Sequence, residues 1–146
     1  MTFMIRPATP ADLPATIKLL ETAGLPVADL SADRLALIAE QNDIFQGVIG
    51  QESFGESALL RSLVVSVEAR GSGVGAALVA ALEGSAATKG VREMWLLTID
   101  AGAFFTRLGY ATRNRTDAPT AIQTTAEFSD LCPGDAVLMS KLMQHQ

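Results

Sequence analysis

The chain alternates between two spacings of apolar residues, one typical of strands and the other of helices. A short apolar segment at 3–6 predicts a strand, and Leu13, Ile17 and Leu20 then follow at helical spacing until Gly24 ends the helix. From residue 35 the pattern changes, and polar turns separate apolar segments at 35–40, 44–54 and 58–67. Segments of this length with short connections predict an antiparallel meander of strands.

A glycine-rich segment at 71–75 ends the meander, and a longer helix follows. This helix is predicted over 74–89, with Leu78, Leu82 and Ala86 facing inward and Gly90 at its C-terminal end. The remaining predicted elements are a strand at 94–99, a helix at 101–108, a strand at 110–113, a helix at 120–128 and a strand at 136–142. An antiparallel unit followed by a βαβ crossover indicates an α/β (α+β) fold with one mixed sheet covered by helices on both faces.

Length and composition narrow the class of protein. With 146 residues, 49% of them apolar, and a mean hydropathy of +0.28, the chain is predicted to fold as one domain spanning 1–146. The longest apolar run, 76–82, is far below the roughly 20 residues of a membrane span, and without a basic-then-apolar pattern near the first strand we do not expect a leader. With Cys132 as its single cysteine, the chain has no internal disulfide, so we expect a cytoplasmic protein without a membrane partner.

Charge and histidine content exclude several functions. Eleven Lys and Arg against sixteen Asp and Glu give a net charge of −5, which disfavours nucleic acid as a partner. The single histidine, His145, lies one residue from the C-terminal end of the sequence. That position argues against a catalytic triad and a histidine-rich metal site, so we expect chemistry without histidine or metal.

The glycine-rich segment carries the most specific signal. An apolar strand leads into Gly71, Gly73 and Gly75, and a helix follows at once. Glycines let successive backbone N–H groups approach an anion, and the positive end of the helix dipole adds to the attraction. The segment therefore predicts a site for a pyrophosphate.

Two interpretations of this site compete on spacing alone. Gly71-x-Gly73-x-x-Ala76 also satisfies a relaxed dinucleotide fingerprint, with Asp100 as the acid for the ribose. A dinucleotide fold usually places this turn after its first strand, however, whereas three or four predicted strands precede it here. A Walker loop is excluded because no Gly-Lys-Ser/Thr closes the segment.

The segment Arg70 to Gly75 resembles the pyrophosphate loop of the GNAT superfamily of acyl-CoA-dependent N-acyltransferases, which has the form Arg/Gln-x-x-Gly-x-Gly/Ala. The resemblance extends to 5–9 and to the aromatic segment 104–110, and it covers nearly the whole chain. A closer likeness, carried by 58–65, 96–98 and 125–133, is to the ArsN-like acetyltransferases of arsenic-resistance operons. The resemblance to the GNAT superfamily implies the GNAT fold and a βαβ acyl-CoA-binding unit.

This resemblance implies acetyl-CoA as cosubstrate and assigns residues to it. The backbone of one strand would bind the pantetheine arm, and the loop amides and an arginine would hold the pyrophosphate. The expected cofactor-binding residues are Leu63, Val64, Val65, Arg70, Gly71, Ser72, Gly73, Val74, Gly75, Phe104 and Arg107.

Two charged residues are candidates for the catalytic and acceptor side. Many relatives place an acid near the position of Arg61, which lies two residues before Leu63 and is expected to share its side of the strand. We hypothesise that Arg61 binds an anionic group of the substrate by a bidentate contact, against the alternative of a surface or ion-paired arginine. Glu52 is the candidate for the base or for an amine anchor, with a solvated strand carboxylate as the alternative.

The usual general acid of the family, the tyrosine of a Phe-Tyr pair, is replaced here by Phe105 after Phe104. Either the thiolate leaves unaided or another group protonates it. Tyr110 is expected to be a packed aromatic residue. Cys132 is expected to be a small buried residue or, beside Pro133, a contact for the substrate.

The sequence thus predicts an N-acetyltransferase that acts on the primary amine of a small anionic amino compound through direct attack in a ternary complex. The ArsN-like resemblance implies a role in resistance to arsenic or phosphinothricin-type compounds. The alternative is an acyl-CoA-binding or sensing module with little catalysis, and protein lysine acetylation is a third reading that Arg61 disfavours. Because dimers are common in the superfamily, a homodimer is a candidate assembly.

Overall fold

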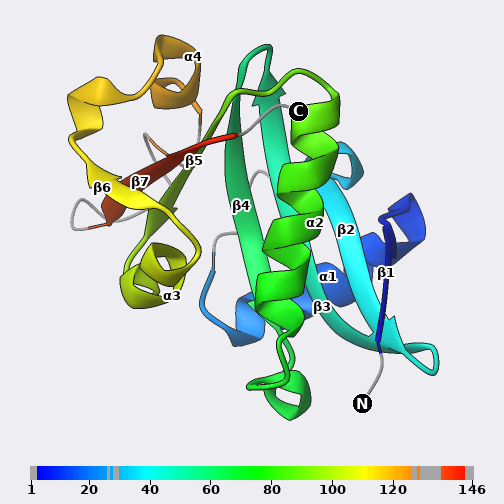
Figure 1. Ribbon diagram of the computed structural model, residues 1–146. Coiled ribbons are helices and arrows are strands. Elements are labelled where there is room, and N and C mark those ends of the chain that lie inside the picture. Colours follow the sequence, from blue (N-terminus) through cyan, green and yellow to red (C-terminus); the bar gives the residue numbers. More distant parts are fainter. Residues whose placement is uncertain (1–2, 26, 28–29, 126–127, 129–135, 144–146) are drawn as a thin grey trace.

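The computed structural model describes residues 3–25, 27, 30–125, 128 and 136–143. They form a seven-stranded sheet of order β1-β2-β3-β4-β5-β7-β6, in which only β4 and β5 pair in parallel (Figure 1). The strands are β1 (Met4–Pro7), β2 (Leu35–Gln41), β3 (Ile44–Phe54), β4 (Ser57–Val65), β5 (Glu93–Thr98), β6 (Ala111–Arg113) and β7 (Val137–Leu142). The α-helices are α1 (Leu13–Thr22), α2 (Val74–Thr88), α3 (Gly102–Arg107) and α4 (Thr120–Gln123).

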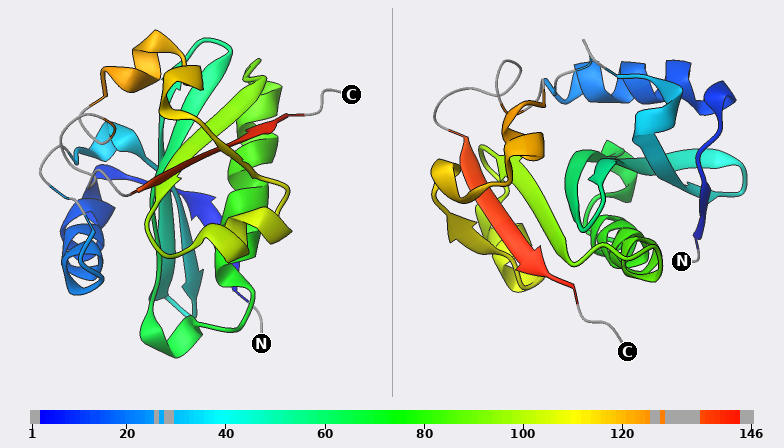
Figure 2. Two further views of the ribbon diagram at one scale, coloured as in Figure 1. Left: turned by 90° about the vertical axis from the view of Figure 1, so that its left-hand side faces the viewer. Right: turned by 90° about the horizontal axis from the view of Figure 1, so that it is seen from above.

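Helices cover both faces of the sheet, as Figure 2 shows for α1 and α2. On one face α2 and α3 bury a cluster that includes Leu78, Leu82 and Phe105 against the strands. On the other face α1 packs through Leu20, and α4 packs through Ile122 beside the buried Trp95. The mixed α/β fold with helices on both faces, predicted from the sequence, is confirmed.

The predicted order of elements is also confirmed, with small differences at the ends. The strand predicted over 58–67 ends at Val65, because a short 3₁₀ turn at Val67–Ala69 leads into the glycine segment. The helix predicted over 120–128 is described as α4 only over Thr120–Gln123, and part of the predicted range lies outside the described residues. In the described ranges, no helix combines the length and the apolar character that a membrane crossing requires.

A β-bulge in β4 corrects one expectation. Val48 pairs with Val64, but Gly50 pairs with Arg61, so β4 holds one more residue than β3 between these pairs. Ser62 takes a φ of +59°, which is uncommon for a residue with a side chain. The extra residue breaks the alternation of faces, so Arg61 and Leu63 do not share a side, contrary to the sequence expectation. Leu63 packs toward α2, whereas Arg61 lies on the face of α1 and α4.

Candidate active site

The parallel strands β4 and β5 pair at one end and then separate. Their recorded pairs are Ser57 with Glu93, Ala58 with Met94 and Leu59 with Trp95, after which the strands diverge (Figure 1). A cavity of about 790 Å³ lies between them. Its walls are the rest of β4, the end of β5, the residues after α1 and the first part of α3. A cavity bounded by two backbone edges can accept a ligand that carries its own amide groups.

The glycine segment adjoins this cavity at the start of α2. Gly73 precedes the first helical residue with a φ of +88°, and Gly71 has a φ of +82°. A Cβ at either position would have open space, so it is the backbone conformation that favours glycine there. The first N–H groups of a helix lack intrahelical partners, and Gly73 has no side chain to cap them. They are therefore available to an anion such as a pyrophosphate.

Two neighbours fix the helix start to the cavity wall. A Cβ at Gly75 would meet Phe104 Cζ at 3.4 Å and Val65 Cγ2 at 3.6 Å, so the first turn of α2 packs directly on both side chains. Arg70 also lines the cavity, and its Nε lies 3.4 Å from the carbonyl oxygen of Val65. Its guanidinium is thereby placed between the glycine segment and β4.

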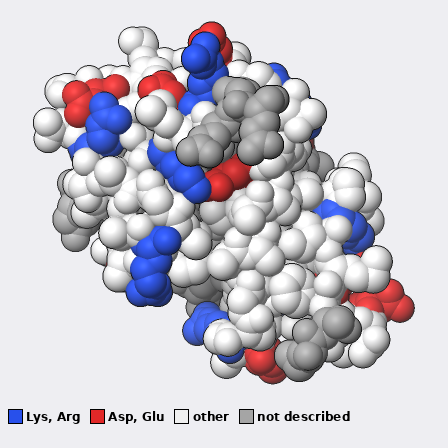
Figure 3. All heavy atoms as spheres, in the orientation of Figure 1, with Lys and Arg blue, Asp and Glu red and all other residues white. Residues whose placement is uncertain are grey.

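The predicted cofactor-binding residues fall into two groups in the structure. Leu63, Val64, Val65, Arg70 and Phe104 line the cavity, and residues 71–75 form its neighbouring helix start. Arg107 lies exposed in the last turn of α3 and is not among the cavity-lining residues. On the face shown in Figure 3, basic and acidic side chains lie beside one another in small scattered groups, so anion binding here depends on local groups.

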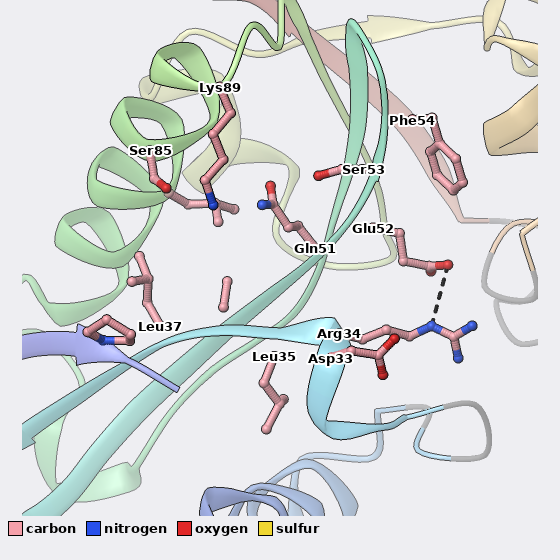
Figure 4. A pocket seen from close by; sticks show the side chains of 13 residues that line it. Asp33, Arg34, Leu35, Leu37, Gln51, Glu52, Ser53, Phe54, Ser85 and Lys89 are labelled. Carbon is pink, nitrogen blue, oxygen red and sulfur yellow. Dashed lines mark ion pairs between the residues drawn. The ribbon is translucent and has the colours of Figure 1, made fainter. Parts of the chain in front are cut away.

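The two catalytic candidates form one ion pair. Arg61 Nη1 donates to Glu52 Oε2 at 3.1 Å, and the Arg61 side chain is fully buried at the cavity wall. Arg61 Nε also donates to Ser62 Oγ at 3.2 Å. The other carboxylate oxygen of Glu52 lies 3.6 Å from Arg34 Nε (Figure 4).

Sequence reasoning offered an ion-paired Arg61 as an alternative, but it missed Glu52 as the partner and missed Arg34. The signal was the hairpin register, because Glu52 lies opposite Leu59 and Arg61 lies opposite Gly50, which makes the two charged residues diagonal neighbours. Both oxygens of Glu52 face guanidinium groups. This arrangement suits the orientation of Arg61 better than it suits proton abstraction from an amine.

Tyr110 is a packed aromatic residue, as predicted. It is buried, meets Phe105 edge to face at 5.6 Å between ring centres, and donates its hydroxyl to Glu83 Oε2 at 2.8 Å. Burial, followed by the nearby Glu83 carboxylate, raises the pKa of Tyr110 far above its ordinary value. Lys141 Nζ holds the other oxygen of Glu83 at 3.0 Å. The phenol proton is thus directed at Glu83, away from the cavity.

Among the described residues, the other polar side chains in the cavity wall are three hydroxyls and the carboxylate of Asp100. Phe104 and Phe105 both line the cavity, where the hydroxyl-bearing residues of the described chain are Thr22, Ser62 and Thr98. Cys132 and His145 lie outside the described residues. Within the described ranges, no group of three or more His, Cys, Asp or Glu side chains is arranged to hold a metal ion.

Several solved structures share this fold. N-acetylglutamate synthase from Neisseria gonorrhoeae, complexed with coenzyme A and N-acetyl-glutamate, is 19% identical with a TM-score of 0.85; the match covers 99% of this chain but only 36% of that one. Rv2747 from Mycobacterium tuberculosis, in complex with CoA and NLQ, is 20% identical with a TM-score of 0.80 over 97% of this chain and 99% of that one. The ribosomal-protein-S18-alanine N-acetyltransferase from Escherichia coli is 19% identical, with a TM-score of 0.71 and coverage of 99% and 96%.

At these identities the solved structures establish the fold, and no curated protein sequence matches the chain. A family model described as an acetyltransferase (GNAT) domain matches residues 32–112, which is more than half of the chain. This range holds the meander, the glycine segment, the diverging strands and α3. The acyltransferase class and the acetyl-CoA cosubstrate predicted from the sequence are confirmed at the level of the family. The chain belongs to the GNAT family of acetyltransferases.

Proposed function

We propose that this protein transfers an acetyl group from acetyl-CoA to the primary amine of a small anionic amino compound. One observation carries the proposal: β4 and β5 diverge to open a cavity with an anion-binding helix start beside it and a buried arginine in its wall. These are the elements that a transferase needs to hold a thioester and an anionic amine side by side.

On the donor side, the backbone amides at the start of α2, within residues 71–75, and the Arg70 guanidinium would hold the pyrophosphate of acetyl-CoA. The backbone edge of Leu63 to Val65 would bind the pantetheine arm, and Phe104 would pack against it. Acetyl-CoA supplies the activated acetyl group. Arg107 stays a predicted contact to the cofactor, reached from the exposed side of α3.

On the acceptor side, Arg61 is the residue that would bind the anionic group of the substrate. Its positive charge is fixed in place by Glu52 and Ser62, so a planar guanidinium is presented with little orientational freedom to a carboxylate, phosphinate or arsinate. Cys132 stays a predicted substrate contact, and Glu52 as base stays a prediction beside its positioning role.

The reaction proposed is direct transfer. The neutral amine nitrogen attacks the carbonyl carbon of the thioester, the C–S bond breaks, and the electron pair leaves with the thiolate. The proton that the nitrogen loses passes through solvent to the thiolate, so the products are the amide and the free thiol. Ser62, the serine in the cavity wall, accepts its hydrogen bond from Arg61, which cannot act as a base. A covalent acyl-serine route therefore has no activated nucleophile among the described cavity residues.

The acceptor class is supported by the N-acetyl-glutamate bound in the Neisseria structure, an acetylated anionic amino acid. The ArsN-like resemblance supports amino compounds of arsenic or of the phosphinothricin type within that class. A cytoplasmic location, a single domain over 1–146, a homodimer and the absence of a nucleic-acid or membrane partner remain part of this proposal.

A second candidate is an acyl-CoA-binding module with little catalysis. Phe105 stands in the cavity wall and the hydroxyl of Tyr110 is committed to Glu83, so the residues of the aromatic segment offer no proton to a leaving thiolate. This module would bind CoA as tightly as the enzyme does.

Thiol release from acetyl-CoA separates the two candidates. The amine panel contains phosphinothricin, glutamate and, as a cationic control, spermidine, and CoA binding is measured by calorimetry on the same protein. Turnover with an anionic amine supports the enzyme, whereas tight CoA binding without turnover on any amine supports the module. Arg61→Lys keeps the charge but loses the planar fork, so the KM for the anionic amine should rise about tenfold; an unchanged KM would refute the role of Arg61.

A further inference from the structure

A second cavity lies where β3 extends beyond β2. The first residue of β2, Leu35, pairs with Gly50, so Gln51–Phe54 of β3 have a strand neighbour only on the side of β4. The C-terminal half of α2 and the 3₁₀ turn Ala32–Arg34 border the open edge (Figure 4). The resulting notch has a volume of about 540 Å³ and shares no lining residue with the cavity between β4 and β5.

Three polar side chains extend into one part of this notch. Figure 4 shows Ser85 of α2 and Lys89, the residue directly after α2, pointing toward Gln51 of β3. Among the described residues, the ammonium group of Lys89 has no hydrogen bond or ion pair. Gln51 Oε1 is buried and has no hydrogen-bond partner. A buried acceptor without a donor is unusual in a folded protein, and a ligand N–H group would satisfy it.

Apolar side chains line the notch where it meets the core, and Asp33, Arg34 and Glu52 line its other end. Leu37 of β2 and the buried Leu82 of α2 lie on the side of α2, whereas Leu35 belongs to the cluster on the side of α1. A volume of this size, an apolar floor and a few convergent polar groups are the usual features of a small-molecule site.

We propose that the notch binds a free α-amino acid with an apolar side chain. The carboxylate lies at Lys89 and Ser85, the amino group donates to Gln51 Oε1, and the side chain packs on Leu37 and Leu82. Each group of the ligand matches one feature of the notch. The carboxylate matches the ammonium group of Lys89, the amino group matches the unpaired acceptor Gln51 Oε1, and the apolar side chain matches these two leucines. Glu52 lies in the wall of the same notch and pairs with Arg61, so one ion pair separates this ligand from the cavity between β4 and β5.

The test is an NMR titration of backbone amides in the full chain without acetyl-CoA, using L-leucine as the probe. Two analogues serve as ligand controls: leucinamide lacks the carboxylate, and 4-methylpentanoate lacks the amino group. We expect saturable shifts at Leu35, Gln51 and Ser85, with each analogue binding about tenfold more weakly than L-leucine.

Variants separate this site from nonspecific binding. Lys89→Ala should weaken L-leucine binding about tenfold, whereas Lys18→Ala, an exposed lysine on α1 across the sheet, should leave it unchanged. Gln51→Leu should make L-leucine and 4-methylpentanoate bind equally. Absence of saturable shifts, equal binding of all three compounds to the native chain, or shifts confined to Leu63 and Thr98 would overturn the proposal. These readouts do not involve thiol release, so they stand or fall independently of the acetyltransferase activity.

Discussion

Arg61 and Glu52 form an ion pair between adjacent strands, with 3.1 Å between Nη1 and Oε2. The Arg61 side chain has no exposed surface, and that of Glu52 is 13% exposed. A charge shielded from water in this way needs a nearby opposite charge. The carboxylate of Glu52 therefore stabilises a cation that faces a substrate-sized cavity.

Removal of the Glu52 charge is expected to be costly. Glu52→Gln removes the carboxylate that pairs with the buried Arg61 among the described residues, so the free energy of unfolding should fall by about 3 kcal/mol, measured by urea denaturation. The matched control is Arg34→Gln, because Arg34 is 35% exposed and lies 3.6 Å from the same carboxylate. That variant should lose less than about 1 kcal/mol. Equal losses in the two variants would contradict the assigned role of burial.

The positive φ of Gly73 predicts a selective effect on CoA binding. Gly73→Ala places a side chain in the left-handed region and should cost about 1 kcal/mol of stability while weakening CoA binding about tenfold, measured by calorimetry. Gly55→Ala is the control, because Gly55 has a φ of +70° and open space around a Cβ but lies in the β3–β4 turn. It should lose similar stability and keep its CoA affinity. If both variants bind CoA like the native chain, the loop does not hold the pyrophosphate.

Tyr110 should make stability depend on pH above 10. Burial raises its pKa in the folded state above the ordinary value of 10.0, so only the unfolded chain releases the phenol proton as the pH passes that value. Tyr110 then costs about 1.4 kcal/mol of stability per pH unit until the pH reaches the raised pKa. Tyr110→Phe should be less stable than the native chain at pH 8 by about 1 kcal/mol and should close this gap between pH 10 and 11. A gap that stays constant in urea denaturation at both pH values would contradict this.

Asp12 should contribute at neutral pH but not in strong acid. Arg6 donates to both of its oxygens, at 2.8 and 2.9 Å, and this hydrogen bonding lowers the pKa of Asp12 from 3.8 to about 2. The stabilisation is present above pH 4 and is lost as the pH falls through 2. Because Arg6 is 33% exposed, Asp12→Asn should cost about 1 kcal/mol at pH 6 and little at pH 2. Asp43→Asn, an exposed turn residue, should show no such difference between the two pH values.

The fold could be predicted because the spacing of apolar residues along the chain matches the side chains that are buried in the structure. The inward residues of α2 and the order of elements along the chain followed from spacing, and the glycine segment predicted the helix start that adjoins the cavity. The bulge at Ser62 could not be predicted. The pairing of β3 with β4 imposes the positive φ of this residue, and a serine in the sequence does not indicate a positive φ. The contact of Tyr110 with Glu83 joins residues 27 positions apart, and it depends on how α2 packs beside the segment after α3.

Because β4 and β5 pair over a short length, the two parts of the sheet on either side of them are joined by few hydrogen-bonded residues. In the described part of the chain, three residue pairs join the four strands on one side of the sheet to the three on the other, and an ion pair between Glu83 and Lys141 adds a further link. A ligand that fills the space beyond those pairs touches both halves at once, so ligand supply and resistance to unfolding become linked. At one hundred times its Kd, such a ligand adds about 2.7 kcal/mol to the free energy of unfolding. If acetyl-CoA is that ligand, the amount of folded protein in a cell would rise and fall with the concentration of acetyl-CoA.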